Sequence, residues 1–214
     1  MGPIAQKRVV RRLDLERVLQ QAEPHPSPKA SLEQYTIPAE VASEILFQAA
    51  YMNDDIIGKT IVDLGCGSGR LAIGSAFLGA EVVGIDIDRL VVKKAQENAK
   101  KISLKKRLSW IVGDIDVLRG KFDTVLQNPP FGVQRKAADR RFVLKALTLA
   151  PRVYSLHKAG ETNRTFIKRF IESKGGKVTS IFQMRFSIPR MFKFHTERRH
   201  EVDVDLYRIE VEEE

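Results

Sequence analysis

The sequence predicts an α/β protein built on a mostly parallel, doubly wound sheet of about seven strands, with an antiparallel final strand. From Thr60 onward, short apolar runs rich in β-forming residues alternate with helix-length amphipathic segments, the pattern of parallel strands joined by helical crossovers. Two of these runs end in glycine-rich or polar turns, and α/β proteins place their ligands at such strand ends. The two turns are therefore the candidate functional sites.

Length and composition favour one main folded unit. The 214 residues are 43% hydrophobic and 29% charged, which is enough for one sizeable core and too little for two ordinary domains. No run is long enough to span a membrane and no leader is evident, so a soluble, cytoplasmic protein is expected. Cys66 is the single cysteine, which excludes an internal disulfide and a cysteine-rich zinc site.

Residues 1–58 are predicted to form a helical extension that precedes a catalytic unit at residues 59–214. A basic amphipathic helix is expected at 9–20, followed by a proline-interrupted connector and a second helix with an apolar stripe at 41–49. The segment 34–36, which is Gln34, Tyr35 and Thr36, lies just before this second helix. It is positioned to close over a ligand.

A glycine-rich loop joins the first strand to a helix. The run 61–69 is apolar before it breaks into three glycines, which allow a tight turn and let a ligand lie against the backbone. Segment 70–78 is predicted to be helical, and the next strand, at 80–86, ends at Asp86. The spacing of about twenty residues from the loop to Asp86 is that of a nucleotide-binding βαβ unit, in which the acid accepts both hydroxyls of a ribose.

The glycines alone leave the nucleotide open. Residues 67–72 fit the G-x-G-x-x-A form of the dinucleotide fingerprint, so an NAD-dependent oxidoreductase is one alternative. Against it, Asp63 stands at the strand end just before the glycines, where a carboxylate suits an ammonium group better than a pyrophosphate. The later motif at 128–131 also has no obvious use in hydride transfer.

That later motif is Asn128-Pro129-Pro130-Phe131, which follows the apolar run 123–127. Proline lacks a backbone N–H and biases the preceding residue towards an extended conformation. The two prolines therefore make a rigid corner whose free carbonyls, with the Asn128 amide, can face a ligand. Taken alone, the motif is equally well interpreted as a stiff strand-to-loop turn.

The remaining segments continue the alternation of strand and helix. Helices are expected at 89–101, 142–149 and 166–171, and strands at 108–112, 152–156, 178–186 and 202–211. The last two strands have no crossover-length helix between them, so they should pair antiparallel. In a sheet of this order, the strand at 108–112 should lie at an edge.

The formal net charge of +9, from 36 Lys and Arg against 27 Asp and Glu, favours an anionic partner. Basic residues cluster after the Asn-Pro-Pro-Phe motif and near the end of the chain: Arg135, Lys136, Arg140, Arg141, Arg190, Lys193, Arg198 and Arg199. Near a nucleotide site these side chains would neutralise phosphates and give salt-sensitive RNA binding. The alternative is an ordinary solvated surface.

Five segments in order resemble the small archaeal and eukaryotic S-adenosylmethionine-dependent ribosomal-RNA adenine-N6 methyltransferases, a methyltransferase-like family with Asn-Pro-Pro-Phe. They are LEQY at 32–35, DLGCG at 63–67, NPPFG at 128–132, YSLHK at 154–158 and FKFH at 192–195. The resemblance covers nearly the whole chain. It implies a Rossmann-like class I methyltransferase fold, S-adenosyl-L-methionine as cofactor and an RNA adenosine, in ribosomal RNA, as methyl acceptor.

The catalytic residues expected on this basis are Asn128, Pro129, Pro130 and Phe131. The adenine amine is a weak nucleophile because its lone pair is delocalised into the ring. The Asn128 side-chain oxygen and the Pro129 carbonyl could accept hydrogen bonds from the two N–H groups of this amine and so aim its lone pair at the methyl group. Phe131 would stack on the flipped base, which is worth about 1–3 kcal/mol. No metal is needed, because the sulfonium leaving group is already activated.

The resemblance also assigns a cofactor site, in which Asp114 faces the adenine amine and Ile115 packs on the ring. The expected cofactor-binding residues are Gln34, Tyr35, Thr36, Asp63, Gly65, Gly67, Ser68, Arg70, Asp86, Asp114 and Ile115. The family pattern has a threonine two residues after the tyrosine, whereas this chain has Ile37 there and Thr36 one position earlier. The RNA-binding residues expected are Arg135, Lys136, Arg140, Arg141, Lys193, Arg198 and Arg199.

Two other functions stay open. A protein-glutamine N5 methyltransferase would present the same two amide N–H groups to Asn128, although those enzymes usually have tyrosine at the position of Phe131. A non-catalytic RNA-binding module would account for the basic loops without any chemistry. His157 and His195 are expected to pack or to contact RNA rather than to transfer protons.

The resembling family's eukaryotic members work with a small zinc-binding activator protein, so a similar partner is expected here. An edge strand with large apolar residues on both faces is an aggregation hazard unless something covers it, and Trp110 lies on the expected edge strand. The alternative is that Trp110 packs under a neighbouring helix and the enzyme acts alone.

Overall fold

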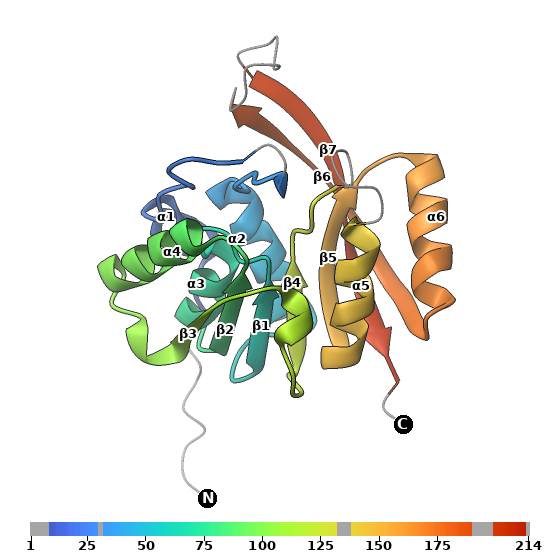
Figure 1. The fold of residues 1–214 in the computed structure, drawn as a ribbon, viewed down its shortest axis with the longest axis horizontal. Helices are drawn as coiled ribbons and strands as arrows, with labels where there is room; N and C mark the ends of the chain where they lie inside the picture. Colours follow the sequence, from blue (N-terminus) through green and yellow to red (C-terminus); the bar gives the residue numbers. More distant parts are fainter. Residues whose placement is uncertain (1–8, 30–31, 132–137, 190–198, 213–214) are drawn as a thin grey trace, which may run out of the picture.

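The computed structural model describes residues 9–29, 32–131, 138–189 and 199–212, and within them it confirms the predicted fold class (Figure 1). Seven strands form one sheet in the order β3-β2-β1-β4-β5-β7-β6. They are β1 (Thr60–Leu64), β2 (Glu81–Asp86), β3 (Leu108–Val112), β4 (Thr124–Gln127), β5 (Arg152–Lys158), β6 (Gly176–Pro189) and β7 (Arg199–Val211). The first five strands are parallel to one another, and β7 runs antiparallel to both β5 and β6.

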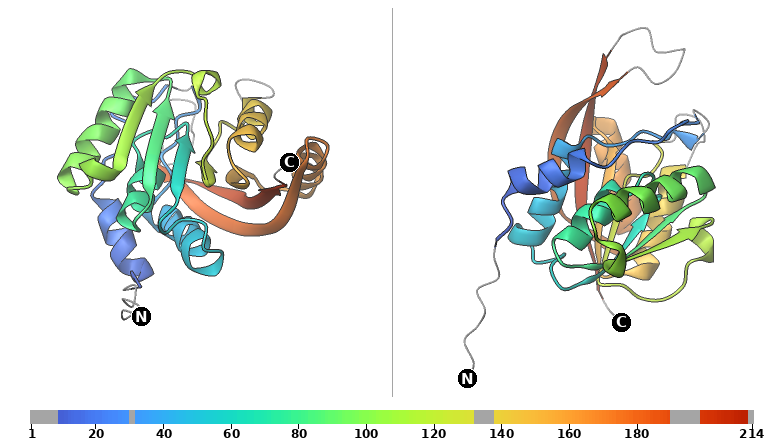
Figure 2. Two further views of the ribbon diagram at one scale, coloured as in Figure 1. Left: turned by 90° about the horizontal axis from the view of Figure 1, so that it is seen from below. Right: turned by 90° about the vertical axis from the view of Figure 1, so that its left-hand side faces the viewer.

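Helices cover both faces of the sheet (Figure 2). They are α1 (Arg12–Gln20), α2 (Ala39–Phe47), α3 (Arg70–Phe77), α4 (Arg89–Lys101), α5 (Ala138–Leu149) and α6 (Glu161–Glu172), with short turns η2 (Gln48–Met52), η3 (Lys105–Arg107) and η4 (Ile115–Val117). One core cluster joins α1, α2 and α3 to one face of the sheet, and the other joins α5 and α6 to the opposite face. None of the helices within the described ranges is long and apolar enough to cross a membrane.

The order of the strands reverses between β1 and β4, which are direct neighbours in the sheet. Ligands of open α/β sheets bind at the carboxyl ends of the strands beside such a reversal. The glycine-rich loop follows β1, and Asn128 follows β4. The topology therefore brings the two sequence motifs to the same place, although more than fifty residues separate them in the chain.

The prediction that β3 lies at an edge of the sheet is confirmed, but Trp110 does not face solvent there. It is half-buried and packs against β2 and the start of α3. A Cβ atom at Gly84 or at Gly69 would come within 2.6 Å of the indole ring, so both positions need glycine. The structure therefore favours the alternative in which Trp110 packs within the protein, and Trp110 gives no support to the predicted partner protein.

The last two strands pair antiparallel, as predicted, and continue past the end of β5. The β5 pairing ends at Lys158, which lies opposite Val204, whereas β6 and β7 stay paired as far as Pro189 and Arg199. The two-stranded end of this hairpin rises beyond the rest of the sheet, at the edge where the parallel strands end (Figure 1).

Candidate active site

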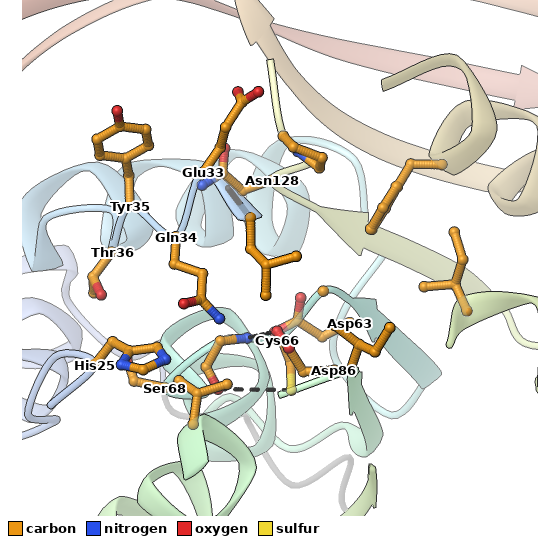
Figure 3. A pocket seen from close by; sticks show the side chains of 18 of the residues that line it. His25, Glu33, Gln34, Tyr35, Thr36, Asp63, Cys66, Ser68, Asp86 and Asn128 are labelled. Carbon is orange, nitrogen blue, oxygen red and sulfur yellow. Dashed lines mark hydrogen bonds between the residues drawn. The ribbon is translucent and has the colours of Figure 1, made fainter. Parts of the chain in front are cut away.

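A pocket of about 360 Å³ opens at the carboxyl ends of β1, β2 and β4 (Figure 3). Six parts of the chain line it: the segment before α2, the glycine-rich loop with the start of α3, the ends of β2 and β3, the first turn of α4, the turn after β4, and the first turns of α5. We call it the cofactor pocket. Every residue that the sequence predicted to bind the cofactor lines it: Gln34, Tyr35, Thr36, Asp63, Gly65, Gly67, Ser68, Arg70, Asp86, Asp114 and Ile115.

The glycine-rich loop is fixed to β2 by its own backbone. Gly65, Gly67 and Gly69 all have positive φ angles, of 69°, 53° and 87°, which residues with a Cβ adopt at a cost. The N–H groups of Gly65 and Cys66 both donate to the Ile85 carbonyl, at 2.9 and 3.0 Å. The turn is therefore formed before any ligand arrives.

Asp86 joins this loop to the start of the next helix. One of its carboxylate oxygens accepts from the Gly67 N–H and the other from the Asp88 N–H, both at 2.9 Å. Burial raises the pKa of Asp86, and the two backbone donors act against that rise. Because each carboxylate oxygen keeps a second lone pair, Asp86 can still accept hydrogen bonds from a ligand.

Asp63 is a second buried acid in the pocket, with 2% of its surface exposed. It accepts one hydrogen bond, from the Ala72 N–H at 3.1 Å. Burial raises the pKa of Asp63 to about 7, the Ala72 N–H lowers it, and the Asp86 carboxylate raises it further. Within the described residues neither acid forms an ion pair, so the pocket suits a positively charged ligand.

At the other end of the pocket, Asp114 is held by the backbone and by an arginine from α5. One of its oxygens accepts from the Asp116 N–H at 2.9 Å and also from the Arg141 guanidinium. The Asp116 N–H is the main reason that the pKa of Asp114 is lowered; burial opposes it, and Arg141 lowers the pKa further. Arg141 also pairs with the Asp116 carboxylate at 2.6 Å, so its charge is compensated inside the protein.

The segment before α2 is tied down by two residues of the nucleotide-binding unit. The Arg70 guanidinium donates to the carbonyls of Ala22 and Ile37, which lie on both sides of this segment. Asp88 caps α4 by accepting a hydrogen bond from the Leu90 N–H, and it also accepts one from Gln34 at 3.2 Å. Arg70 therefore lines the pocket while its charged group holds the segment that closes over it.

Asn128 lies between the cofactor pocket and a second, much smaller pocket. Its side-chain oxygen is buried and has no hydrogen-bond partner in the described part of the chain. The smaller pocket, which we call the aromatic cleft, is lined by Glu33, Tyr35, Ile37, Asn128, Pro129, Phe131 and Phe186. Its volume is about 10 Å³, which is room for a single water molecule. Phe131 is half-buried against the core here and is not free to stack on a base without movement.

His157 and Cys66 have surroundings that do not suit a proton-transfer group or a nucleophile. His157 is buried, its Nε2 lies 2.8 Å from the Ser155 Oγ, and its ring packs edge-on against Tyr207. Burial lowers the pKa of His157 to about 3, so the ring is neutral, in agreement with the predicted packing role. Burial and the two nearby carboxylates raise the pKa of the Cys66 thiol, which keeps it protonated.

The predicted RNA-binding residues are only partly visible. Arg135, Lys136, Arg190, Lys193 and Arg198 lie outside the described residues, as does His195, and of Arg199 only its place at the start of β7 is described. Arg140 lies in the first turn of α5, with its guanidinium 5.7 Å from the centre of the Phe166 ring. Its neighbour Arg141 faces the cofactor pocket instead.

Several lining residues escaped the sequence analysis: His25, Leu32, Glu33, Ile37, Cys66, Leu71, Ile87, Val91, Gly113, Ala138 and Phe142. Ile87 had a usable signal, because it directly follows the predicted ribose acid and is 56% exposed at the pocket. His25 and Phe142 had none, since they come from segments 61 residues before and 56 after Asp86. The Phe142 ring closes on Gly65, where a Cβ would lie 3.0 Å from it.

Comparison with known proteins gives a consistent family. The model of the methyltransferase small domain matches residues 39–176. The chain is 36% identical over 205 residues to the rRNA N(6)-adenosine-methyltransferase Mettl5 of Drosophila melanogaster. This alignment covers 92% of this chain and 95% of that protein. It is 41% identical over 213 residues to the uncharacterized protein MJ0284 of Methanocaldococcus jannaschii, covering 94% and 95%.

A solved structure agrees with the sequence relatives. The crystal structure of PH1948 from Pyrococcus horikoshii, a proposed RNA methyltransferase, superposes with a TM-score of 0.88 at 37% identity. The superposition covers 95% of this chain and 98% of that one. The likeness therefore includes the N-terminal helices and the closing hairpin as well as the central sheet.

Proposed function

Because the chain belongs to the methyltransferase small domain family and is similar over most of its length to rRNA N6-adenosine-methyltransferases, we propose that it methylates the N6 amine of an adenosine in ribosomal RNA. The cofactor is S-adenosyl-L-methionine. When bound, it supplies a methyl group already activated by a positively charged sulfur. The tasks left to the protein are to hold the cofactor and to orient the target amine.

The observation that carries the proposal is the unpaired oxygen of Asn128. A buried acceptor without a donor costs about 1–3 kcal/mol, so folded proteins keep few of them. The next two residues, Pro129 and Pro130, have no N–H that could satisfy it. Asn128 lines both pockets, so we propose that its oxygen accepts a hydrogen bond from an amine that enters from the aromatic cleft.

The residues of the cofactor pocket fit S-adenosylmethionine group by group. Asp63 offers a buried carboxylate to an ammonium, and Asp86 offers its remaining lone pairs to ribose hydroxyls. Asp114 and Ile115 stand at the end of β3, where the acid can accept from an adenine amine. Ile87, the exposed aliphatic side chain that the sequence analysis missed, gives the adenine ring a second apolar surface.

The target adenine would reach Asn128 through the aromatic cleft. Asn128 Oδ1 and the Pro129 carbonyl would accept the two N–H bonds of the amine, which turns its lone pair away from the ring system. The cleft now holds room for one water molecule, so Phe131 and the facing Tyr35 or Phe186 must separate before a base can enter. Once it has entered, the base can stack on the ring of Phe131.

We also propose a partner protein, and the reason is a group of exposed aliphatic side chains near the end of β3 rather than Trp110. The carboxyl end of the edge strand β3 and the segments next to it carry three exposed aliphatic side chains outside the cofactor pocket: Leu90, Val112 and Val117, which are 55%, 51% and 61% exposed. Such a group beside a free strand edge suits a small activator protein that adds a strand. We further propose that the enzyme works in the cytoplasm.

The test is methylation of deproteinised ribosomal RNA with labelled S-adenosylmethionine, followed by mass spectrometry of the nucleosides and mapping of the modified base. A glutamine-containing peptide and denatured ribosomal protein serve as the parallel substrates. Label found as N6-methyladenosine at one site supports the proposal. Label found on glutamine, with none in RNA, would establish the protein-glutamine alternative instead.

A further inference from the structure

The exposed aromatic surface between α5 and α6 is not explained by the chemistry of the two pockets. Phe166 of α6 is 47% exposed, and its ring stacks on that of Phe170 with centroids 6.4 Å apart and planes 12° from parallel. The Arg140 guanidinium lies over Phe166 at 5.7 Å from the ring centre. The two helices lie side by side on one face of the sheet (Figure 1). We call these three residues the aromatic ladder.

The charge of Arg140 is available to a ligand, in contrast to the charges around it. Arg141 is paired with Asp114 and Asp116, and Arg164 is paired with the buried Asp205. Arg140 forms no ion pair with any residue that the structure describes, and its guanidinium lies against the face of Phe166. A guanidinium held over an exposed ring is a surface on which both a nucleobase and a phosphate can bind.

The ladder is also close to the reaction site. Ala138, Arg141 and Phe142 in the first turns of α5 line the cofactor pocket, and Arg140 is on the opposite side of the same turn. The distance from pocket to ladder is therefore about the width of one helix, roughly 10 Å. A nucleotide one or two positions from the one bound at Asn128 can reach the ladder, because each extended nucleotide adds several ångströms to the reach of the strand.

The role of these contacts rests on the proposed function, which is methylation of RNA. We propose that the aromatic ladder of Arg140, Phe166 and Phe170 binds an unpaired nucleotide that flanks the target adenosine, with its base stacked on the ladder and its phosphate on Arg140. The helices carry six basic residues against three acidic ones, so their charge fits a polyanion. The stacked base is held by its face, so the ladder recognises single-stranded RNA rather than a particular base.

Affinity for RNA tests the proposal through matched variants of the full chain. The probe is an oligonucleotide from the mapped ribosomal site with the target adenosine in an unpaired segment. Phe166→Ala should weaken its binding by about fivefold or more, since stacking is lost, while S-adenosylmethionine affinity stays unchanged. Phe166→Leu keeps apolar volume but not the ring face, and should also bind weakly. Phe166→Trp should restore binding. Leu13→Ala, which removes an exposed apolar side chain from α1, is the control and should bind like the wild type.

A covalent readout then locates the base. 5-Iodouridine placed at each position beside the target adenosine should cross-link to Phe166 or Phe170 on irradiation at one of them, because the reaction needs a stacked aromatic ring. Equal affinity of Phe166→Ala and wild type, or cross-links found only elsewhere, would overturn the ladder while leaving the proposed function intact. If the wild type neither binds nor methylates RNA, the proposed function fails and the ladder proposal fails with it.

Discussion

The two pockets that meet at Asn128 differ in how far they are formed before a ligand binds. In the cofactor pocket, the glycine-rich loop is hydrogen-bonded to β2, and the buried acids Asp63 and Asp86 already accept hydrogen bonds from backbone N–H groups. The pocket encloses about 360 Å³. The aromatic cleft has about 10 Å³, and the acceptor beside it, Asn128 Oδ1, has no donor among the described residues.

This difference implies an order of events. A preformed pocket loses little free energy to rearrangement when the cofactor binds, whereas the cleft must open for each base that enters. The orphan oxygen of Asn128 favours that opening, because a target amine supplies the hydrogen bond it lacks. Substitutions in the first region should therefore change cofactor affinity, and substitutions in the second should change turnover.

The largest effect is expected from Asn128→Ala. Loss of one positioned hydrogen-bonding group at a reacting centre commonly lowers kcat by about 10²–10³-fold. Cofactor affinity should stay within about twofold of the wild type, because the acids and the glycine-rich loop are untouched. Single-turnover methylation and calorimetry with S-adenosylhomocysteine measure the two quantities separately. Substantial turnover in this variant would reduce the Asn-Pro-Pro-Phe motif to a structural turn.

The reverse result is expected from Asp86→Ala. In the proposed complex the carboxylate would accept charge-assisted hydrogen bonds from both ribose hydroxyls, each worth about 1.5–3 kcal/mol, so the cofactor Kd should rise by about a hundredfold or more. The Gly67 and Asp88 N–H groups lose their acceptor as well. Calorimetry gives the Kd, with Asp203→Ala, an exposed acid on β7, as the control. Unchanged affinity for the cofactor in Asp86→Ala would contradict the assignment of this pocket.

A pH dependence should distinguish the two pockets, because it is expected in cofactor binding and not in the opening of the aromatic cleft. Burial raises the pKa of Asp63 to about 7, so below pH 7 the free protein holds a proton there. An ammonium ligand needs the ionised carboxylate and must displace that proton. Affinity should therefore rise by about tenfold or more between pH 5.5 and pH 7. Calorimetry in buffers of different ionisation enthalpy should detect the released proton, and Asp63→Asn should show none.

The smallest effect separates two neighbouring arginines. Arg140→Ala should reduce the slope of log affinity against log salt by about 0.7–0.9, as one phosphate contact is lost. Arg141→Ala should change the slope much less, because its charge is already paired with Asp114 and Asp116. Fluorescence anisotropy at several salt concentrations measures both slopes. Equal changes would mean that Arg141 leaves its acids and reaches the RNA backbone.

Much of the fold follows from local patterns in the sequence. The strand and helix periods predicted the parallel sheet, the antiparallel end and the edge position of β3, all of which the topology confirms. The glycines before α3 and the acid at the end of β2 predicted that the loop and Asp86 would line one pocket, because the spacing of a βαβ unit fixes where its loop and acid meet, and both do line it.

The contacts that close the site could not be predicted in the same way. Arg70 reaches the carbonyls of Ala22 and Ile37, and Arg141 crosses from α5 to the acids after β3. These side chains join segments that are far apart in the sequence, and no periodic signal marks such pairs. A charged residue on a helix has the same local pattern whether its partner is solvent, RNA or a carboxylate, which is why Arg141 was assigned to RNA.

The packing of Trp110 gives the molecule a natural optical reporter. Trp110 is the single tryptophan in the chain, and its indole touches Gly69 at the end of the glycine-rich loop and Gly84 in β2. Intrinsic emission on excitation near the red edge of protein absorption therefore comes from one known place beneath the cofactor pocket. A ligand that lies on this loop changes the surroundings of this one fluorophore, even when the loop itself does not move. Cofactor binding and release can be followed in real time on the unlabelled enzyme.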